Sequence, residues 1–404
     1  MVNRRRGVCA ALLAAVVAAT AGCGTGDSAA PARPEVDLAT LDVGNLNAEP
    51  TYYDKPTNLD MARLVEAMRL GNHLPLPMEI DPELKYAPTK IAAVRTFTAT
   101  SSAAITNRFQ GDSAALDGRI GGFVSGFVTA GRTNTTHNLS WDLDNVAMLF
   151  ETEQDAARAA DAFTEVERAA LGADIQIQSI PGFPEARAHS APSFPGGIHS
   201  YYSAGRFLLF TEIRDNAMYE LRRSDPEQLR NRVARSIEKL KPALLSFTPT
   251  PVAELMQLDV DPERMLARAL NTVDDPGQYG IPGVYNRHGG LQIGFNPEAD
   301  SRMFEQAGVD AVAWKGGYVY RSRDARAAQW LIDERSDVGK FYRRAPAPAA
   351  LPFTRCLEYI GPATGVAYYC GVTFDRYAAE VTAGQLTDAQ QRISAQYAIL
   401  ARSK

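Results

Sequence analysis

Residues that bind metal ions or act as nucleophiles are scarce in this sequence, which has five histidines and four cysteines among 404 residues. No two of the histidines lie one helical turn apart with an acidic neighbour, as a zinc-binding helix requires. The sequence also lacks a glycine-rich loop with Gly-Lys-Ser or dinucleotide spacing. It therefore predicts no metal site, no cofactor and no catalytic residues. The histidines are His73, His137, His189, His199 and His288.

An excess of positive charge is missing too, since the formal net charge is -5 at pH 7. Nucleic-acid binding and attraction to anionic membrane surfaces both need a basic face. We therefore expect no nucleic-acid partner. Hydrophobic residues make up 45% of the chain, enough for two domains of ordinary size to bury a core each.

The only long apolar run is at the N-terminus, where residues 8–19 follow three arginines. This run is too short to span a bilayer and has the layout of an export signal. We predict a signal peptide over residues 1–22, with the Sec and twin-arginine routes both open.

The signal ends in Thr20-Ala21-Gly22-Cys23, which resembles the bacterial lipobox although Thr20 replaces the usual leucine. The resemblance implies that Cys23 is diacylated, with palmitate-type chains, and becomes the first residue of the mature protein. Two acyl chains anchor a protein stably. We expect a membrane-anchored lipoprotein on the outer face of the cytoplasmic membrane. The alternative is an ordinary secretory signal with an incidental cysteine.

Cys356 and Cys370 are the cysteines that remain for pairing, because Cys9 leaves with the signal. Disulfides form in exported proteins. Two short apolar segments flank a Gly-Pro-rich turn, and folding about Ala363 places Cys356 opposite Cys370. We predict a disulfide hairpin, which would contribute roughly 3 kcal/mol. Two buried free thiols are the alternative.

The fold class predicted is α+β, with two related units that are each a mostly antiparallel sheet with helices on one face. A first helix is expected between Asn58, as its N-cap, and Gly71, just past its end. Further helices are expected at residues 155–171 and 226–245, around residues 328–332 and at the C-terminus, and the interpretation of residues 100–135 stays open. The predicted domains are a lipidated cysteine with a flexible tether (23–50), a first domain (51–247), a linker (248–262) and a second domain (263–404).

An internal duplication is suggested by two helices whose apolar residues coincide at an offset of 160: Leu229, Val233, Ile237 and Leu240 match Ala389, Ile393, Tyr397 and Leu400. This offset also pairs Gly205 with Gly365 and Asp215 with Asp375. The earlier helix needs an offset of 169 to pair Asp155 with Asp324. Helical periodicity alone can produce such a match.

Three groups of residues allow a functional interpretation beside a structural one. Ser125 is not in the Gly-x-Ser-x-Gly context of hydrolases. The run Asp259, Asp261 and Glu263 could bind calcium, but a helix cap with Pro262 at the first position fits better. The tryptophans could line a ligand cleft, although aromatic residues in strands are mostly core. They are Trp141, Trp314 and Trp330.

The lipobox, the helix ending in Leu-Val-Glu-Ala-Met-Arg-Leu-Gly at residues 64–71 and the segment 76–82 together resemble a family of uncharacterised actinobacterial cell-envelope lipoproteins of mycobacterial or nocardial type. That family is defined by a domain of unknown function. The resemblance implies an envelope lipoprotein and transfers no catalytic residues.

The leading functional hypothesis is a non-enzymatic, lipid-anchored protein that binds a small molecule, a lipid or a glycan, in a cleft between the two units. The alternative is an envelope protein with an interaction, structural or sensing role. An envelope hydrolase that uses one of the histidines is the third hypothesis.

Overall fold

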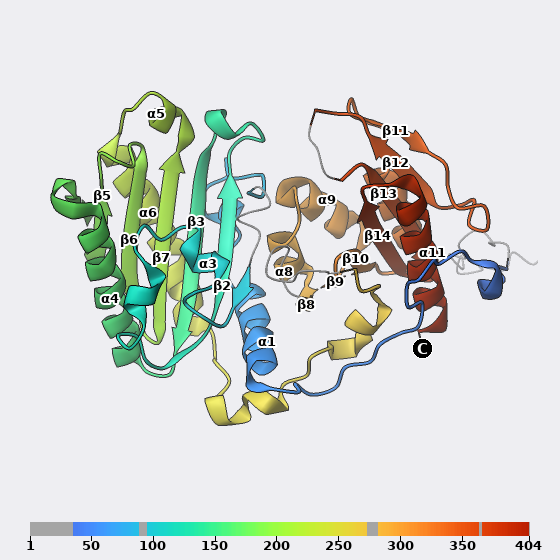
Figure 1. The fold of residues 1–404 in the computed structure, drawn as a ribbon, viewed down its shortest axis with the longest axis horizontal. Helices are drawn as coiled ribbons and strands as arrows, with labels where there is room; N and C mark the ends of the chain where they lie inside the picture. The colour runs from blue at the N-terminus through green and yellow to red at the C-terminus, as the bar shows by residue number, and fades with distance from the viewer. Residues whose placement is uncertain (1–34, 89–94, 273–281, 363–365, 404) are drawn as a thin grey trace, which may run out of the picture.

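Two seven-stranded antiparallel sheets, one in each half of the chain, form the body of the protein (Figure 1). The computed structural model describes residues 35–88, 95–272, 282–362 and 366–403. The predicted signal peptide and Cys23 lie outside these residues. Within the described chain, no helix is both long and apolar enough to cross a membrane. The α+β prediction with two related units is confirmed, but helices cover both faces of each sheet and not one.

The N-terminal unit has the strand order β1-β2-β3-β7-β6-β5-β4. Helix α4 (Glu153–Leu171) covers one face, and α1 (Leu59–Gly71) and α6 (Pro226–Ser246) cover the other. The strands are β1 (Thr96–Phe97), β2 (Phe123–Arg132), β3 (Trp141–Phe150), β4 (Gln176–Ile180), β5 (Phe183–Ser190), β6 (Gly197–Ala204) and β7 (Phe207–Asp215).

The C-terminal unit has the strand order β11-β12-β13-β14-β10-β9-β8. Helices α9 (Pro297–Ala307) and α10 (Ala325–Arg335) cover one face, and α11 (Leu386–Arg402) covers the other. The strands are β8 (Gly283–Asn286), β9 (Ala311–Trp314), β10 (Tyr318–Arg321), β11 (Tyr342–Ala345), β12 (Arg355–Tyr359), β13 (Tyr368–Phe374) and β14 (Tyr377–Ala383).

Short helical segments connect these elements. Among the residues that the structure describes, four of these segments are α-helical: α2 (Pro77–Ile80), α3 (Ala103–Thr106), α5 (Asn216–Glu220) and α8 (Arg287–Gln292). The remainder are 3₁₀ turns: η1 (Leu38–Thr40), η3 (Ser113–Leu116), η4 (His137–Leu139), η5 (Gly172–Asp174), η6 (Val252–Gln257), η7 (Pro262–Arg264) and η8 (Leu266–Arg268).

The two units share one topology, because replacing β1 to β7 by β8 to β14 turns the first strand order into the second. In both, a helix follows the third strand and another follows the seventh (α4 and α6, then α10 and α11). The residues of α6 and α11 that were matched at offset 160 are all buried. The structure therefore supports an internal duplication.

The predicted residue matches outside these last helices are wrong. Gly205 (φ +55°) and Asp375 (φ +49°) occupy the same turn position, before Arg206 and Arg376, so the hairpins match at an offset of 170. Gly365 lies outside the described residues. In the first unit α5 lies between the last strand and the last helix, whereas in the second unit the last helix follows the last strand directly. The shorter connection in the second unit reduces the offset from 170 at the hairpins to 160 at the last helices.

The matched helices after the third strand begin at Thr152 and Asp324, which are their N-caps. Asp155, which the sequence comparison paired with Asp324, lies three residues inside α4. Its carboxylate instead accepts a hydrogen bond from the Thr152 hydroxyl at 2.5 Å.

The glycine-rich region that the sequence left unassigned is strand β2. A Cβ atom on Gly126 would lie 2.2 Å from the ring of Phe97, and one on Gly131 would lie 2.5 Å from Pro77. Both glycines therefore make room for side chains that pack directly on the strand backbone. They mark close packing on a strand and not a helix.

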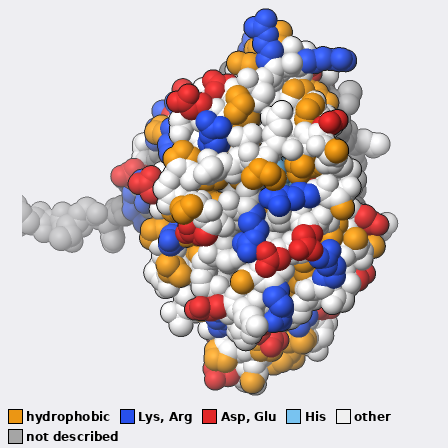
Figure 2. Space-filling model, turned by 90° about the vertical axis from the view of Figure 1, so that its left-hand side faces the viewer, with side chains coloured by type: hydrophobic (Ala, Val, Ile, Leu, Met, Phe, Trp, Pro, Cys, Tyr) orange, Lys and Arg blue, Asp and Glu red, His pale blue; other side chains and the backbone are white. Residues whose placement is uncertain are grey.

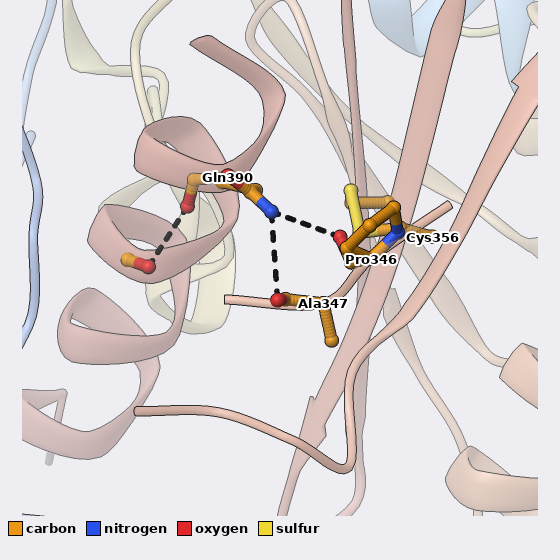
Figure 3. Close-up of a disulfide and its surroundings, with 6 residues drawn as sticks. Pro346, Ala347, Cys356 and Gln390 are labelled. Carbon is orange, nitrogen blue, oxygen red and sulfur yellow. Dashed lines mark hydrogen bonds between the residues drawn. A yellow bond between two sulfur atoms is a disulfide. The ribbon is translucent and has the colours of Figure 1, made fainter. Parts of the chain in front are cut away.

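The predicted disulfide is present. Cys356 of β12 lies opposite Cys370 of β13, and the two sulfur atoms are bonded. Near the bridge, the Gln390 side chain of α11 donates hydrogen bonds to the carbonyl oxygens of Pro346 at 2.9 Å and Ala347 at 3.4 Å (Figure 3). The bridge ties together two strands whose side chains form the core beneath α11.

Residues 35–50, predicted as part of a flexible tether, pack against the C-terminal unit. Leu41 is buried in the core beneath α11, and Val43 packs beside it. Arg402 donates a hydrogen bond to the carbonyl of Ala48 at 2.8 Å, and Gln391 donates one to Asp42 at 3.1 Å. Apolar residues spaced along the segment form its buried side. The segment was predicted to be flexible because its overall composition is polar.

Direct hydrogen bonds join the two units beside α1, which lies between the sheets (Figure 1). The Gln292 amide donates to the carbonyl of Leu74 at 2.9 Å and accepts from the Thr129 hydroxyl at 2.9 Å. Asn286 N donates to the side chain of Asn72 at 3.1 Å. This part of the boundary, where we expected a cleft, is therefore closed by paired polar groups.

Candidate functional site

Polar side chains form a row across four strands of the first sheet, on the face that α4 covers. His189 of β5 lies opposite His199 of β6, and His199 lies opposite Glu212 of β7. Glu212 in turn lies opposite Asp144 of β3. Opposite residues project from the same face of a sheet. The exposed fractions of His189, His199 and Glu212 are only 1%, 2% and 5%.

Helix α4 adds a carboxylate to this row. The Thr152 hydroxyl caps the helix by accepting a hydrogen bond from the Asp155 amide at 3.1 Å. Ala156, Ala159 and Ala160 are fully buried, and such small side chains allow the helix to approach the sheet closely. Two turns after Ala160, Glu167 lies on the same helical face and is 0% exposed.

The Glu167 carboxylate is surrounded by donors. Oε1 accepts a hydrogen bond from the Gln110 amide at 2.8 Å and lies 2.7 Å from His199 Nδ1. Oε2 accepts one from the Tyr201 hydroxyl at 2.7 Å and lies 3.0 Å from His189 Nε2. We call Glu167, His189 and His199 the histidine cluster.

Electrostatics within the cluster favour the charged forms of Glu167 and His199. Burial alone would lower the pKa of His199, but the carboxylates of Glu167 and Glu212 raise it to about 10. Burial would likewise raise the pKa of Glu167, but His199 and His189 hold it well below its usual range. An imidazolium–carboxylate pair is therefore the resting arrangement.

Some nitrogen atoms of the cluster have no hydrogen-bond partner. Both ring nitrogens of His189 and Nε2 of His199 are buried and unpaired. His189 Nε2 is close to Glu167, and His199 Nε2 is 3.7 Å from Glu212, but neither contact has hydrogen-bond geometry. Buried polar atoms without partners are rare in native proteins and call for an explanation.

The C-terminal unit has an ionic group that joins the last residue of α10 to residues of α9 and β14. Arg335 donates hydrogen bonds to Asp300 at 2.5 Å and to Glu380 at 2.7 Å. The Tyr320 hydroxyl also donates to Glu380, at 3.0 Å. We call Arg335, Asp300 and Glu380 the arginine triad. It contains no histidine, and none of its side-chain atoms is among the buried unpaired atoms of the described residues.

The other three histidines lie apart from the histidine cluster. His73 Nε2 is 3.0 Å from the carbonyl of Ala243, and His288 Nε2 is 2.9 Å from that of Leu74. His137 is on the surface beside Arg132. His73 thus contacts helix α6, His288 connects the second unit to the first, and His137 contacts a neighbouring strand residue.

Ser125 and the serines that follow His189 and His199 in the sequence form no hydrogen bond with a histidine. Ser190 follows His189 on the same strand, so its side chain points to the opposite face, where it accepts a hydrogen bond from Gln178 at 3.0 Å. Ser200 is next to His199 in the same way. Ser125 is buried on β2 with its hydroxyl unpaired.

The acidic run is dispersed, and the predicted helix cap is confirmed only in position: Asp261 precedes Pro262 of the short turn η7, but its side chain makes no capping hydrogen bond to that turn. Asp261 accepts hydrogen bonds from the amides of Leu266 at 2.5 Å and Ala267 at 2.8 Å. Asp259 pairs with Lys55, and Glu263 pairs with Arg321.

The tryptophans line no common cleft. Trp141 is in the first sheet beneath the guanidinium of Arg232. Trp314 and Trp330 lie in β9 and α10 of the other unit.

Sequence spacing did not reveal the histidine cluster, because its members come from one helix and two strands. The signal that was available is the ten-residue separation of His189 and His199 around the Pro-Gly-Gly of residues 195–197. Such a turn brings two strand residues face to face. We had predicted no strand at residues 183–190, so that pairing was missed.

Comparison with known proteins identifies the family. No curated protein and no solved structure matches the chain. Two family models do match: the N-terminal part of a domain of unknown function, DUF7373, over residues 53–260, and its C-terminal part over residues 265–403. These ranges meet beside the linker that we predicted at 248–262. Together they cover most of the chain, which therefore belongs to the DUF7373 family.

Proposed function

We propose that this protein is a non-enzymatic binding protein of the cell envelope, anchored by diacylated Cys23, and that its ligand carries an anionic group. The ligand would be a small molecule, a lipid or a glycan. The observation that carries the proposal is Arg95, a buried arginine at the boundary between the two units.

Arg95 is only 7% exposed, and Nη1 donates one long hydrogen bond, 3.5 Å, to the carbonyl of Val128. No carboxylate of the described residues forms an ion pair with it; Asp144, the nearby carboxylate, pairs with Arg108 at 2.8 Å. Tyr285 and Tyr318 of the second unit lie around it, and burial lowers its pKa to about 10.

A buried guanidinium with so few partners is unfavourable. An anionic group would offset that cost, since the planar fork of arginine suits carboxylates and phosphates. The site lies beside the boundary of the two units, where ligands bind preferentially. Acidic and basic side chains are interspersed on the outer face of the N-terminal unit (Figure 2). That face therefore has no large area of positive charge that would attract an anionic ligand.

Export is supported by the disulfide and by the path of the N-terminal segment. The bridge between Cys356 and Cys370 suits an oxidising compartment. Residues 35–50 leave along the C-terminal unit. The chain from Cys23 to Glu35 spans at most about 40 Å, so the anchor would hold the C-terminal unit next to the membrane.

Replacing Cys23 by alanine should release the protein from the membrane, because the variant has no sulfur to acylate. We expect the wild-type chain in the membrane fraction with a diacyl mass adduct, and the variant in the soluble exported fraction without it. Wild-type chain without the adduct, or an anchored variant, would show that the lipid anchor is wrong. Cys9→Ala, inside the signal, is the matched control.

Replacing Arg95 by methionine should weaken ligand binding by about 10- to 100-fold, the usual worth of a hydrogen-bonded charge. The full chain would be purified in detergent and examined by native mass spectrometry, with organic extraction of copurifying molecules. Arg119→Met, at an exposed ion pair with Glu165, is the control. A bound molecule retained equally by the Arg95 variant would contradict the proposal. A wild-type chain without any ligand would favour an interaction or structural role instead.

A further inference from the structure

We propose that the histidine cluster binds one divalent transition-metal ion, with zinc as the best match. The ligands are Glu167, His189 and His199. This site lies within the N-terminal unit and does not depend on the ligand proposed at Arg95.

The first argument is the convergence of donor atoms. One ligand atom from each of the three residues lies within 4.8 Å of the other two. His199 Nδ1 lies 2.7 Å from one oxygen of Glu167, and His189 Nε2 lies 3.0 Å from the other. Two imidazoles and one carboxylate form a common zinc ligand set. Imidazole-rich sites suit zinc and its neighbours, whereas magnesium and calcium prefer oxygen ligands alone.

The second argument is the unpaired imidazole of His189. Its Nε2 faces the Glu167 carboxylate at 3.0 Å without hydrogen-bond geometry, and the ring is 1% exposed. A ring nitrogen that lies close to a carboxylate oxygen without hydrogen-bond alignment can bind, together with that oxygen, a metal ion placed between them. A metal ion at that point would give His189 a well-aligned partner, since none of the described residues forms a hydrogen bond with its ring.

The third argument is the set of groups around the ligands. His199 offers Nδ1 to the site, and its other nitrogen points toward Glu212 at 3.7 Å. Arg214 holds Glu212 by donating a hydrogen bond at 2.7 Å. Metal-bound histidines usually direct their second nitrogen at such a carboxylate. Tyr201 and the Gln110 amide orient Glu167 in the same way.

The C-terminal unit provides an internal comparison. Its arginine triad joins the end of α10 to α9 and β14, while the histidine cluster joins α4 to β5 and β6. There the cation is an arginine that donates to both carboxylates. This largely buried ionic group contains no histidine and no unpaired nitrogen, whereas the histidine cluster of the first unit has both.

Both imidazoles ligate a metal ion only in their neutral form. The ion then balances the charges of Glu167 and Glu212. Because the ligands are 0–2% exposed, metal enters during folding or through local opening, and exchange with solution is slow.

The test measures metal bound to the full chain, purified in detergent without chelator. The protein would be unfolded with chelator, refolded with or without Zn²⁺, desalted and assayed for zinc by mass spectrometry. We expect about one zinc per chain, and a melting temperature that rises with the Zn²⁺ concentration. Replacing zinc by Co²⁺ should give visible absorption bands of imidazole and carboxylate coordination.

Variants assign the site. We expect His189→Gln and His199→Gln to lose stoichiometric zinc and the cobalt bands. Glu212→Gln should weaken binding about 10- to 100-fold, as loss of a supporting carboxylate does. His137→Gln, at a surface histidine, and Arg95→Met should bind zinc as the wild type does, which separates this site from the ligand at Arg95.

The wild-type measurement keeps the proposal testable even if the buried variants fail to fold. A folded wild-type chain that holds no stoichiometric zinc after refolding, and whose melting temperature Zn²⁺ leaves unchanged, overturns it. So does zinc that is retained equally by the folded histidine variants.

Discussion

Replacing Arg335 by methionine is expected to destabilise the C-terminal unit by about 3–5 kcal/mol, the usual cost of removing one member of a buried ion pair. Its guanidinium bridges Asp300 and Glu380, so its loss leaves two carboxylates together without a cation. Asp300 is 4% exposed; burial raises its pKa, an effect that Arg335 opposes. Urea denaturation monitored by circular dichroism would measure the loss.

Arg355→Met is the matched control. Arg355 of β12 pairs at 2.8 Å with Asp333 of α10, the helix that also contains Arg335, and both side chains of this pair are well exposed. Exposed pairs contribute little, so this variant should unfold almost as the wild type does. Combining Arg335→Met with Asp300→Asn and Glu380→Gln should restore much of the lost stability, since no buried charge remains. Equal losses for Arg335→Met and the control would refute the role of burial.

The helices and several strands could be predicted because their signals are local. Asn58 precedes an apolar stripe, and its side chain accepts a hydrogen bond from the Met61 amide at 2.8 Å, as a helix cap does. The cysteine hairpin was predictable for a similar reason, since a Gly-Pro turn fixes which residues face each other. Capping and turn chemistry act over a few residues, and a sequence displays them directly.

The strands that escaped prediction depend on contacts far away in the chain. Gly126 suits β2 only because the ring of Phe97 lies against it, and the sequence does not show that contact. Residues 35–50 resembled a tether because their partner, α11, is more than 300 residues away. In both cases the deciding interaction is tertiary.

The histidine cluster was hidden for the same reason. His189 and His199 meet only when β5 and β6 pair in one register, and a shift by one residue would turn both rings to the other face. Glu167 joins them because alanines bring α4 close to the sheet. Spacing rules for metal sites on a single helix cannot detect a site built from a helix and two strands.

Exchanging Glu167 for glutamine is expected to cost the metal-free protein about 3–5 kcal/mol, because it leaves the buried His199 imidazolium without its counterion. The new amide group would also face donors from Tyr201 and Gln110, which both give hydrogen bonds to the present carboxylate. Hydrogen exchange in peptides from β5 and β6, read by mass spectrometry, should show the loss in the N-terminal unit. Glu165→Gln, on the exposed side of α4, is the control and should leave exchange unchanged.

Repeating the Glu167→Gln measurement with Zn²⁺ separates two roles of the carboxylate. As a counterion alone, Glu167 would contribute the same stability with and without zinc, and the difference between variant and wild type would stay constant. As a metal ligand, it lets zinc stabilise the wild type but not the variant, so the difference grows with the Zn²⁺ concentration. We expect the second pattern, since a carboxylate that only balanced charge would not leave His189 unpaired beside it.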